Sequence, residues 1–79
     1  MTKERFVEQI DALQGRLYRI ALSMLRNDAD VQDALQETVL KAWEKQYTLR
    51  NEAYFATWVT RIAINVCKQT LRQQKRIVL

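Results

Sequence analysis

The sequence predicts an all-α fold, a small three-helix bundle with helices over about residues 3–26, 29–45 and 52–76. In each of these segments apolar residues recur at steps of three and four, which places them on one face of a helix. No segment alternates apolar and polar residues, as a strand with one buried face does. The 79 residues include one glycine and no proline, so helices of this length can form without interruption.

The first helix is predicted from an apolar stripe that recurs every three or four residues. Its members are Phe6, Ile10, Leu13, Leu17, Ile20 and Met24, with Tyr18, Leu22 and Leu25 widening the stripe near its end. Gly15 lies inside this helix at a cost of about 1 kcal/mol relative to alanine. We interpret this glycine as a bend or as a close contact with a neighbouring helix.

The second helix follows a break at residues 26–30, where Asp28 is the expected N-cap and Asp30 the alternative. The inward face is predicted to comprise Val31, Ala34, Leu35, Thr38, Val39, Ala42 and Trp43, with the tryptophan in the core. The outward face carries acids and amides around one leucine, namely Asp33, Gln36, Glu37, Leu40 and Glu44. This face is either an ordinary solvated surface or a docking site for a basic or mixed partner, with the leucine as its apolar anchor.

The third helix, expected to begin at Asn51 or Glu52, carries an apolar arc on one side and a basic stripe on the other. The apolar arc comprises Phe55, Trp58, Val59, Ile62, Ala63 and Val66. The basic stripe comprises Arg61, Asn65, Lys68, Arg72 and Lys75. Cations near a helix C-terminus favour the negative end of the dipole, so the stripe is either a solvated helix end or a nucleic-acid surface. The preceding loop, residues 46–52, adds Tyr47 and Arg50, which is more aromatic and basic character than a connector needs.

Charge is segregated along the chain. Residues 27–45 hold five acids against two lysines, whereas residues 46–79 hold six cations against one acid. Such segregation indicates two partner surfaces of opposite sign rather than one uniformly basic protein.

The composition argues against an enzyme or a metal protein. Histidine, the commonest general base and metal ligand, is absent from the sequence, and one glycine cannot build a glycine-rich phosphate loop. We therefore expect no catalytic residue, no cofactor, no metal and no small-molecule substrate. The single cysteine, Cys67, is interpreted as a small apolar residue rather than a redox sensor. With no signal-peptide core and no apolar run near the ~20 residues of a membrane span, we expect a cytoplasmic protein.

Two stretches of the chain resemble the bacterial RNA polymerase sigma factors. Residues 28–43, DADVQDALQETVLKAW, resemble the second conserved region of these proteins. Residues 55–65, FATWVTRIAIN, followed by Leu71 and Arg72, resemble the promoter-melting part of the same domain. The resemblance spans about residues 6–76 and is strongest to the extracytoplasmic-function (ECF) group of the sigma-70 family.

The resemblance implies a single region 2 domain over residues 1–79, without the C-terminal region 4 domain that reads the minus-thirty-five promoter element. In the family, the acidic face binds the clamp coiled coil of the largest subunit of core RNA polymerase. Here that face comprises Asp33, Gln36, Glu37, Leu40 and Glu44. In the family, the loop and third helix recognise the minus-ten promoter element, melt the duplex and capture a flipped base of the non-template strand. The matching residues here are Tyr47, Arg50, Asn51, Tyr54, Thr57, Trp58, Arg61, Asn65, Lys68, Arg72, Lys75 and Arg76.

These residue types suit that task. Lysine and arginine neutralise phosphates, aromatic rings stack on unpaired bases, and an asparagine amide can hydrogen-bond to a base edge. For Trp58, core packing and base stacking both remain open. The predicted function is to direct transcription initiation by binding polymerase and opening the promoter, with an anti-sigma protein as a further candidate partner. The alternative is a sigma-like helical protein-interaction module that binds polymerase or an anti-sigma protein without binding DNA.

Overall fold

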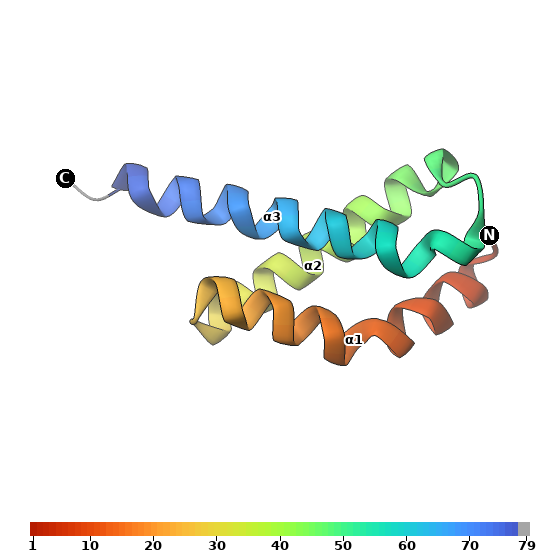
Figure 1. Cartoon of the computed structure of the whole chain (residues 1–79), viewed down its shortest axis with the longest axis horizontal. Helices are drawn as coiled ribbons and strands as arrows, with labels where there is room; N and C mark the ends of the chain where they lie inside the picture. Colours follow the sequence, from red (N-terminus) through yellow and green to blue (C-terminus); the bar gives the residue numbers. More distant parts are fainter. Residues whose placement is uncertain (78–79) are drawn as a thin grey trace.

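In the computed structural model, three long helices pack into an elongated bundle, which confirms the predicted all-α fold (Figure 1). The structure describes the backbone of residues 1–77 and the side chains of residues 1–75. The helices are α1 (Lys3–Leu25), α2 (Asp28–Lys45) and α3 (Phe55–Ile77), and each packs against the other two. Two single-turn 3₁₀-helices, η1 (Gln46–Thr48) and η2 (Glu52–Tyr54), connect α2 to α3. In Figure 1, α1 and α3 lie in front and α2 crosses behind them.

Side chains near the predicted breaks cap the first two helices. Thr2 Oγ1 accepts a hydrogen bond from Arg5 N at 3.1 Å and caps α1. Asn27 Oδ1 accepts one from Asp30 N at 3.1 Å, so Asn27 is the N-cap of α2, and the predicted caps Asp28 and Asp30 were wrong. Both aspartates lie in the first turn instead, where their charge is favourable at the positive end of the helix dipole.

The predicted loop before α3 is partly helical, and α3 begins later than expected. It begins at Phe55 rather than at Asn51 or Glu52, because η2 precedes it. Asn51 Oδ1 accepts a hydrogen bond from Ala53 N at 2.9 Å, and the Asn51 carbonyl accepts one from Tyr54 N at 3.0 Å. Asparagine caps a 3₁₀ turn and an α-helix by the same contact, so the sequence signal does not distinguish the two.

Two apolar clusters form the core. The first comprises Phe6, Ile10, Leu13, Leu17, Ala42, Phe55, Val59 and Ala63. The second comprises Ala21, Leu25, Val31, Ala34, Val66 and Cys67. In α1, Ala21 and Leu25 are buried, whereas the predicted stripe members Ile20 and Met24 are only half-buried. A fully buried alanine allows close packing of the neighbouring helix, a role that the hydrophobic pattern does not reveal.

The predicted inward face of α2 is confirmed except for Trp43, which is 40% exposed. The Trp43 ring packs edge-on against Phe6, with 5.1 Å between ring centroids and an interplanar angle of 73°. It lies at the rim of a groove whose walls come from α1 and α2 alone. The prediction that Trp43 lies in the core was therefore wrong, because α3 does not cover this side of α2.

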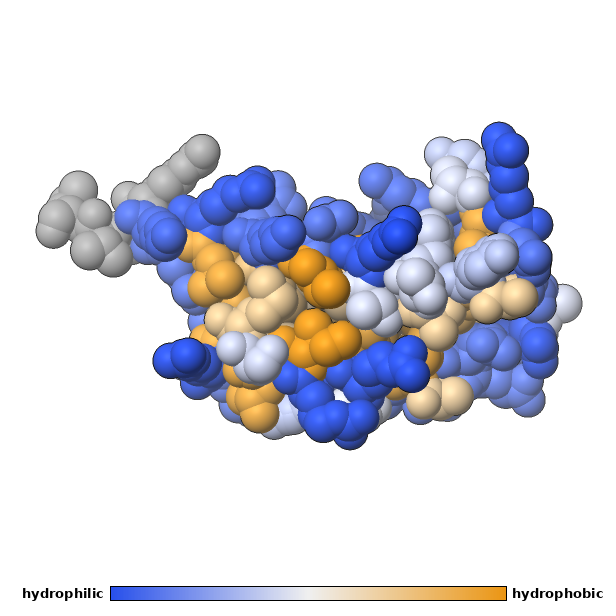
Figure 2. Space-filling model, in the orientation of Figure 1, coloured by the Kyte–Doolittle hydropathy of each residue, from blue (hydrophilic) through white to orange (hydrophobic). Residues whose placement is uncertain are grey.

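Within residues 1–77, none of the helices has the length and apolar character needed to cross a membrane. The surface that faces the viewer in Figure 2 carries hydrophilic side chains along the outer edge of α3. An apolar patch lies between α3 and α1.

Gly15 lies on the exposed side of α1, so its interpretation as a close helix contact was wrong. A Cβ atom at this position meets only Nη1 of Arg19, at 3.3 Å. That atom is the far end of a flexible side chain on the same helix. The glycine therefore lowers helix stability without a packing role.

We expect Gly15→Ala to raise the free energy of unfolding by about 1 kcal/mol, because alanine has the higher helix propensity and Arg19 can move aside. In a domain of this size, the change raises Tm by about 4–8 °C, measured by far-ultraviolet circular dichroism. The matched control, Ala12→Gly at another exposed position of α1, should lower Tm by a similar amount. An unchanged or lower Tm for Gly15→Ala would show that the glycine serves a contact.

Candidate functional site

The predicted acidic face lies exposed on α2. All five of its residues are exposed, namely Asp33, Gln36, Glu37, Leu40 and Glu44. Lys41 Nζ lies 3.7 Å from Glu37 Oε1, so one of the acids is partly neutralised. Among the described side chains, Asp33 and Glu44 make no ion pair. The face therefore keeps unpaired negative charge beside an apolar side chain that is 57% exposed, Leu40.

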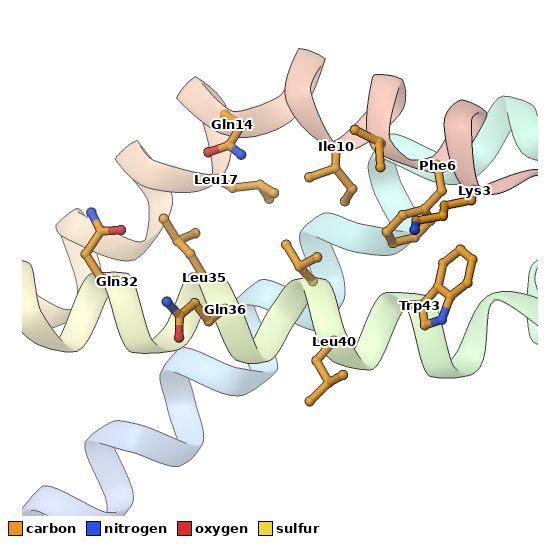
Figure 3. Close-up of a pocket in the computed structure, with 12 residues that line it drawn as sticks. Lys3, Phe6, Ile10, Gln14, Leu17, Gln32, Leu35, Gln36, Leu40 and Trp43 are labelled. Carbon is orange, nitrogen blue, oxygen red and sulfur yellow. The ribbon is translucent and has the colours of Figure 1, made fainter.

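The acidic face forms a ridge between two grooves. The larger groove, with a volume of about 690 Å³, lies between α1 and α2 and has Gln36 and Leu40 in its wall (Figure 3). The smaller groove, of about 310 Å³, lies between α2 and α3 and has Asp33 and Glu37 in its wall. Glu44 borders neither of these two grooves. The predicted residues are thus divided between an apolar and a polar environment.

The smaller groove brings polar side chains of α2 and α3 together. Asp30, Thr70, Gln73 and Gln74 line it beside the two acids of the ridge. Gln74 Nε2 donates a hydrogen bond to Asp30 Oδ2 at 2.7 Å, which ties α3 to the first turn of α2. In the part of the chain that the structure describes, no group of three or more acidic, cysteine or histidine residues is arranged to hold a metal ion.

The basic stripe is exposed along α3. Its residues Arg61, Asn65, Lys68, Arg72 and Lys75 are all exposed, and the buried residues Val59, Ala63 and Val66 lie on the opposite side of the helix. None of the four cations forms an ion pair with another described side chain. The predicted Arg76 has its side chain outside the described residues. Unpaired cations in one row produce a positive potential that attracts a polyanion.

The segment between α2 and α3 exposes two tyrosines. Tyr47 is 82% exposed and Tyr54 is 64% exposed. The predicted residues Arg50, Asn51 and Thr57 are also exposed. Trp58 is half-buried and packs against the first core cluster, with its ring centroid 6.0 Å from that of Phe55. Core packing of Trp58 therefore agrees with the structure, and the tyrosines are the more accessible aromatic surfaces.

Two contacts define the position of η2. The Asn51 side-chain oxygen accepts a hydrogen bond from Ala53 N at 2.9 Å, which commits one of its two lone pairs to η2. Arg5 Nε donates to Glu52 Oε2 at 3.4 Å and connects the first turn of α1 to η2. Both side chains of this pair are about half exposed, so the pair contributes little to stability. The pair does offset the charge of Glu52, which is the one acid among residues 46–79.

Cys67 is 1% exposed, and burial raises the pKa of its thiol. A buried, protonated thiol is a poor nucleophile, which supports the interpretation of Cys67 as a small apolar residue.

Tyr18 donates its phenolic hydrogen to Asp28 Oδ1 at 3.1 Å, and this hydrogen bond and the carboxylate charge raise the pKa of Tyr18. The contact links α1 to the first turn of α2.

The fold and these surfaces together define a helical binding module, with an acidic face on α2 and a basic face on α3 beside exposed aromatic rings. The chain belongs to the sigma-70 region 2 family, because residues 9–77 match the family described as Sigma-70 region 2. This match confirms the resemblance seen in the sequence. A search of solved structures gave no match.

Curated relatives carry sigma-factor names. RNA polymerase sigma factor SigV of Bacillus subtilis is 33% identical over 76 residues, covering 96% of this chain and 46% of the relative. ECF RNA polymerase sigma-E factor of Haemophilus influenzae is 28% identical over 87 residues, with the same two coverages of 96% and 46%. ECF RNA polymerase sigma factor SigM of Mycobacterium tuberculosis is 35% identical over 60 residues, covering 76% of this chain and 31% of the relative. The similarity to the ECF group is confirmed, and the chain spans less than half the length of these relatives.

Sequence reasoning missed the features that two helices build together. The larger groove has Val7 and Gln14 of α1 in its wall, and neither was assigned to a site. The signal in the sequence is that Val7 follows Phe6 and widens the apolar stripe on one side. The contact of Arg5 with Glu52 joins positions 47 residues apart, beyond the reach of any local pattern.

We expect Cys67 of the folded protein to react with Ellman's reagent at least about tenfold more slowly than in the urea-unfolded protein, because the thiol is buried and its raised pKa lowers the thiolate fraction. The folded-state rate should keep rising with pH where an exposed thiol is already fully ionised. The absorbance of the released chromophore measures both rates, with glutathione as the reference thiol. Rapid stoichiometric reaction of the folded protein would contradict the apolar role and favour a redox sensor.

Proposed function

We propose that the chain is a sigma-factor domain, spanning residues 1–79, that directs transcription initiation by binding core RNA polymerase and opening the minus-ten promoter element. The observation that carries this proposal is the exposed row of unpaired cations on α3, which follows a segment with two exposed tyrosines. Family membership supports the same role, because relatives are named RNA polymerase sigma factors. As a partner of polymerase, the protein would act in the cytoplasm.

In this proposal the basic stripe binds the phosphate backbone of the promoter. The cations Arg61, Lys68, Arg72 and Lys75, with the predicted Arg76, neutralise phosphates and give an affinity that falls as salt rises. Such contacts are independent of base sequence, and they fix the register of the strand along α3.

The segment from η1 to η2 captures the flipped base. Extruding a base from a duplex costs a few kcal/mol, and stacking on an aromatic ring returns ~1–3 kcal/mol per base. Tyr47 and Tyr54 are the exposed rings, and stacking on both can offset the cost of extrusion. Arg50 and Thr57 supply polar contacts beside them, and Trp58 supports this surface from the core.

Asn65 is the better candidate for reading a base edge. Its side chain is exposed between two cations of the stripe, so its donor and acceptor can pair with one base. The oxygen of Asn51 already accepts the Ala53 N–H, which holds that side chain against η2. Asn51 therefore shapes η2 and is less free than Asn65 to turn its amide toward a base edge.

The acidic face of α2 binds the clamp coiled coil of the largest polymerase subunit. Asp33 and Glu44 attract basic residues of the partner, with Gln36 and Glu37 as further polar contacts. Leu40 serves as the apolar anchor. An anti-sigma protein that covers the same face would keep the domain from polymerase.

The first test concerns the non-template strand. A minus-ten sequence selected from a random single-stranded DNA library should bind at least about fivefold more tightly than its scrambled version, in fluorescence anisotropy at low salt. Arg61→Ala should weaken the binding of both oligonucleotides equally, because it removes a phosphate contact. It should also reduce the slope of log affinity against log salt concentration by about one. Asn65→Ala should reduce the difference in affinity between the selected and the scrambled oligonucleotide, because it removes a base contact worth about 1–3 kcal/mol.

The matched control is Arg16→Ala, since Arg16 is an exposed arginine of α1 away from the stripe. This variant should bind both oligonucleotides as the unchanged protein does. Equal affinity for the selected and scrambled sequences, or no binding to either, would favour the protein-interaction module that does not bind DNA.

The second test concerns polymerase. Replacing both Asp33 and Gln36 by alanine should weaken binding to core RNA polymerase at least tenfold, or about 1.4 kcal/mol, because it removes an unpaired charge and an amide from the docking face. Helicity should not change, because both side chains are exposed. Asp11→Ala, which removes an exposed acid from α1, is the control and should bind normally. Unchanged binding of the double variant would exclude the acidic face as the docking site.

A further inference from the structure

The second half of α1 carries a row of cations that the proposed function does not use. Arg16, Arg19 and Arg26 are exposed, and none of them forms an ion pair with another described side chain. Residues 12–26 contain no acid, so nothing in this half of the helix offsets their charge. Cations favour the negative end of a helix dipole, but that effect is confined to the last turn and does not reach Arg16.

Half-buried apolar side chains lie between this row and the basic stripe of α3. They are Ile20 and Met24 of α1 with Ile64 and Leu71 of α3, and we refer to these four as the apolar strip. Met24 and Leu71 pack against the second core cluster. The strip borders neither the groove between α1 and α2 nor the groove between α2 and α3. It therefore lies on the third side of the bundle, where α1 packs against α3.

Cations border the apolar strip on both sides. On α1, Arg16 precedes Ile20 by four residues, so the two are neighbours on the helix surface, with the exposed arginine on the outer side. On α3, Lys68 follows Ile64 by four residues and is likewise the more exposed of the two. Figure 2 shows an apolar patch between α3 and α1, with hydrophilic side chains along both helices beside it. The face is thus apolar along its middle and positive along both edges.

This distribution of charge defines the chemistry of a partner. The partner needs an apolar ridge that covers the strip and acids on both flanks that face the cations. An amphipathic helix has this form when its apolar stripe is narrow and is bordered on each side by glutamate or aspartate.

A nucleic-acid strand fits this face less well. Its phosphates could pair with the cations, but unpaired bases stack on aromatic rings, and the apolar strip contains none. The two exposed tyrosines, Tyr47 and Tyr54, belong to the segment between α2 and α3 instead.

We infer that the face between α1 and α3, centred on the apolar strip, is a docking site for an acidic amphipathic helix of a partner protein. This face is separate from the acidic face of α2, and the inference does not rest on the proposed function. Lys68 and Lys75 belong both to its edge and to the basic stripe. Within the proposed function, the partner would therefore compete with the promoter strand for these two lysines.

The probe is a fluorescein-labelled peptide of three heptads, with leucine at every a and d position and glutamate at every e and g position. Repulsion between its own glutamates opposes self-association, so the peptide remains available to a basic surface. In fluorescence anisotropy, we expect it to bind the protein at least about tenfold more tightly than the same peptide with lysine at e and g. Replacing its leucines by alanine should weaken binding at least about tenfold, because the apolar strip then stays exposed to water.

The double variant Arg16→Glu with Lys68→Glu places an acid on each edge of the face. It should bind the glutamate peptide at least about tenfold more weakly, because like charges then face each other. Both positions are exposed, so helicity should not change. Lys45→Glu is the matched control, since it reverses an exposed cation at the end of α2, outside this face. This control should bind the peptide within about twofold of the unchanged protein.

Equal binding of the glutamate and lysine peptides, binding of neither, or normal binding of the double variant would overturn the inference and leave the proposed function intact. If Arg16→Glu weakened the binding of single-stranded DNA but not of the peptide, the face would belong to nucleic acid instead. Sedimentation showing self-association that the double variant abolishes would assign the face to the acidic face of a second copy.

Discussion

The edge-on contacts of Phe6 join all three helices at one end of the bundle. Its ring meets Trp43 of α2 at 5.1 Å and Phe55 of α3 at 5.7 Å between centroids. Such pairs contribute about 0.5–1.5 kcal/mol each beyond the area that they bury. A chain of this length buries only about 60% of its unfolded surface and has a small margin of stability. The two contacts are therefore a considerable part of what holds α1 in place.

Both proposed interfaces depend on this aromatic contact. Phe55 is the first residue of α3 and directly follows η2, so its position decides where Tyr54 is presented. On the other side, Trp43 packs edge-on against Phe6 and lies at the end of the groove between α1 and α2. One set of rings thus supports the proposed DNA surface on one side and the proposed polymerase surface on the other. In the proposed function both partners bind at once, because the acidic face lies on α2 and the basic stripe on α3.

The residues on helix faces were the predictable part of this protein. Arg61 and Asn65 lie on the exposed side of α3 because the period of an α-helix fixes which residues share a face. Trp43 was assigned to the core from the apolar periodicity of α2, yet it lies at the rim of the groove between α1 and α2. The periodicity does not say how much of a helix its neighbours cover. Ala21 is fully buried although alanine adds little to a hydrophobic stripe.

The sequence by itself determined the fold class, the three helices, the family and the segregation of charge, because each follows from local periodicity or from a contiguous motif. Only the tertiary structure decided that the acidic face is a ridge, with Gln36 and Leu40 toward an apolar groove and Asp33 and Glu37 toward a polar one. It also placed Val7 beside the proposed docking face. The physical reason is that a groove needs two walls, and the position of α1 against α2 is set by side-chain packing between residues that are far apart in the chain.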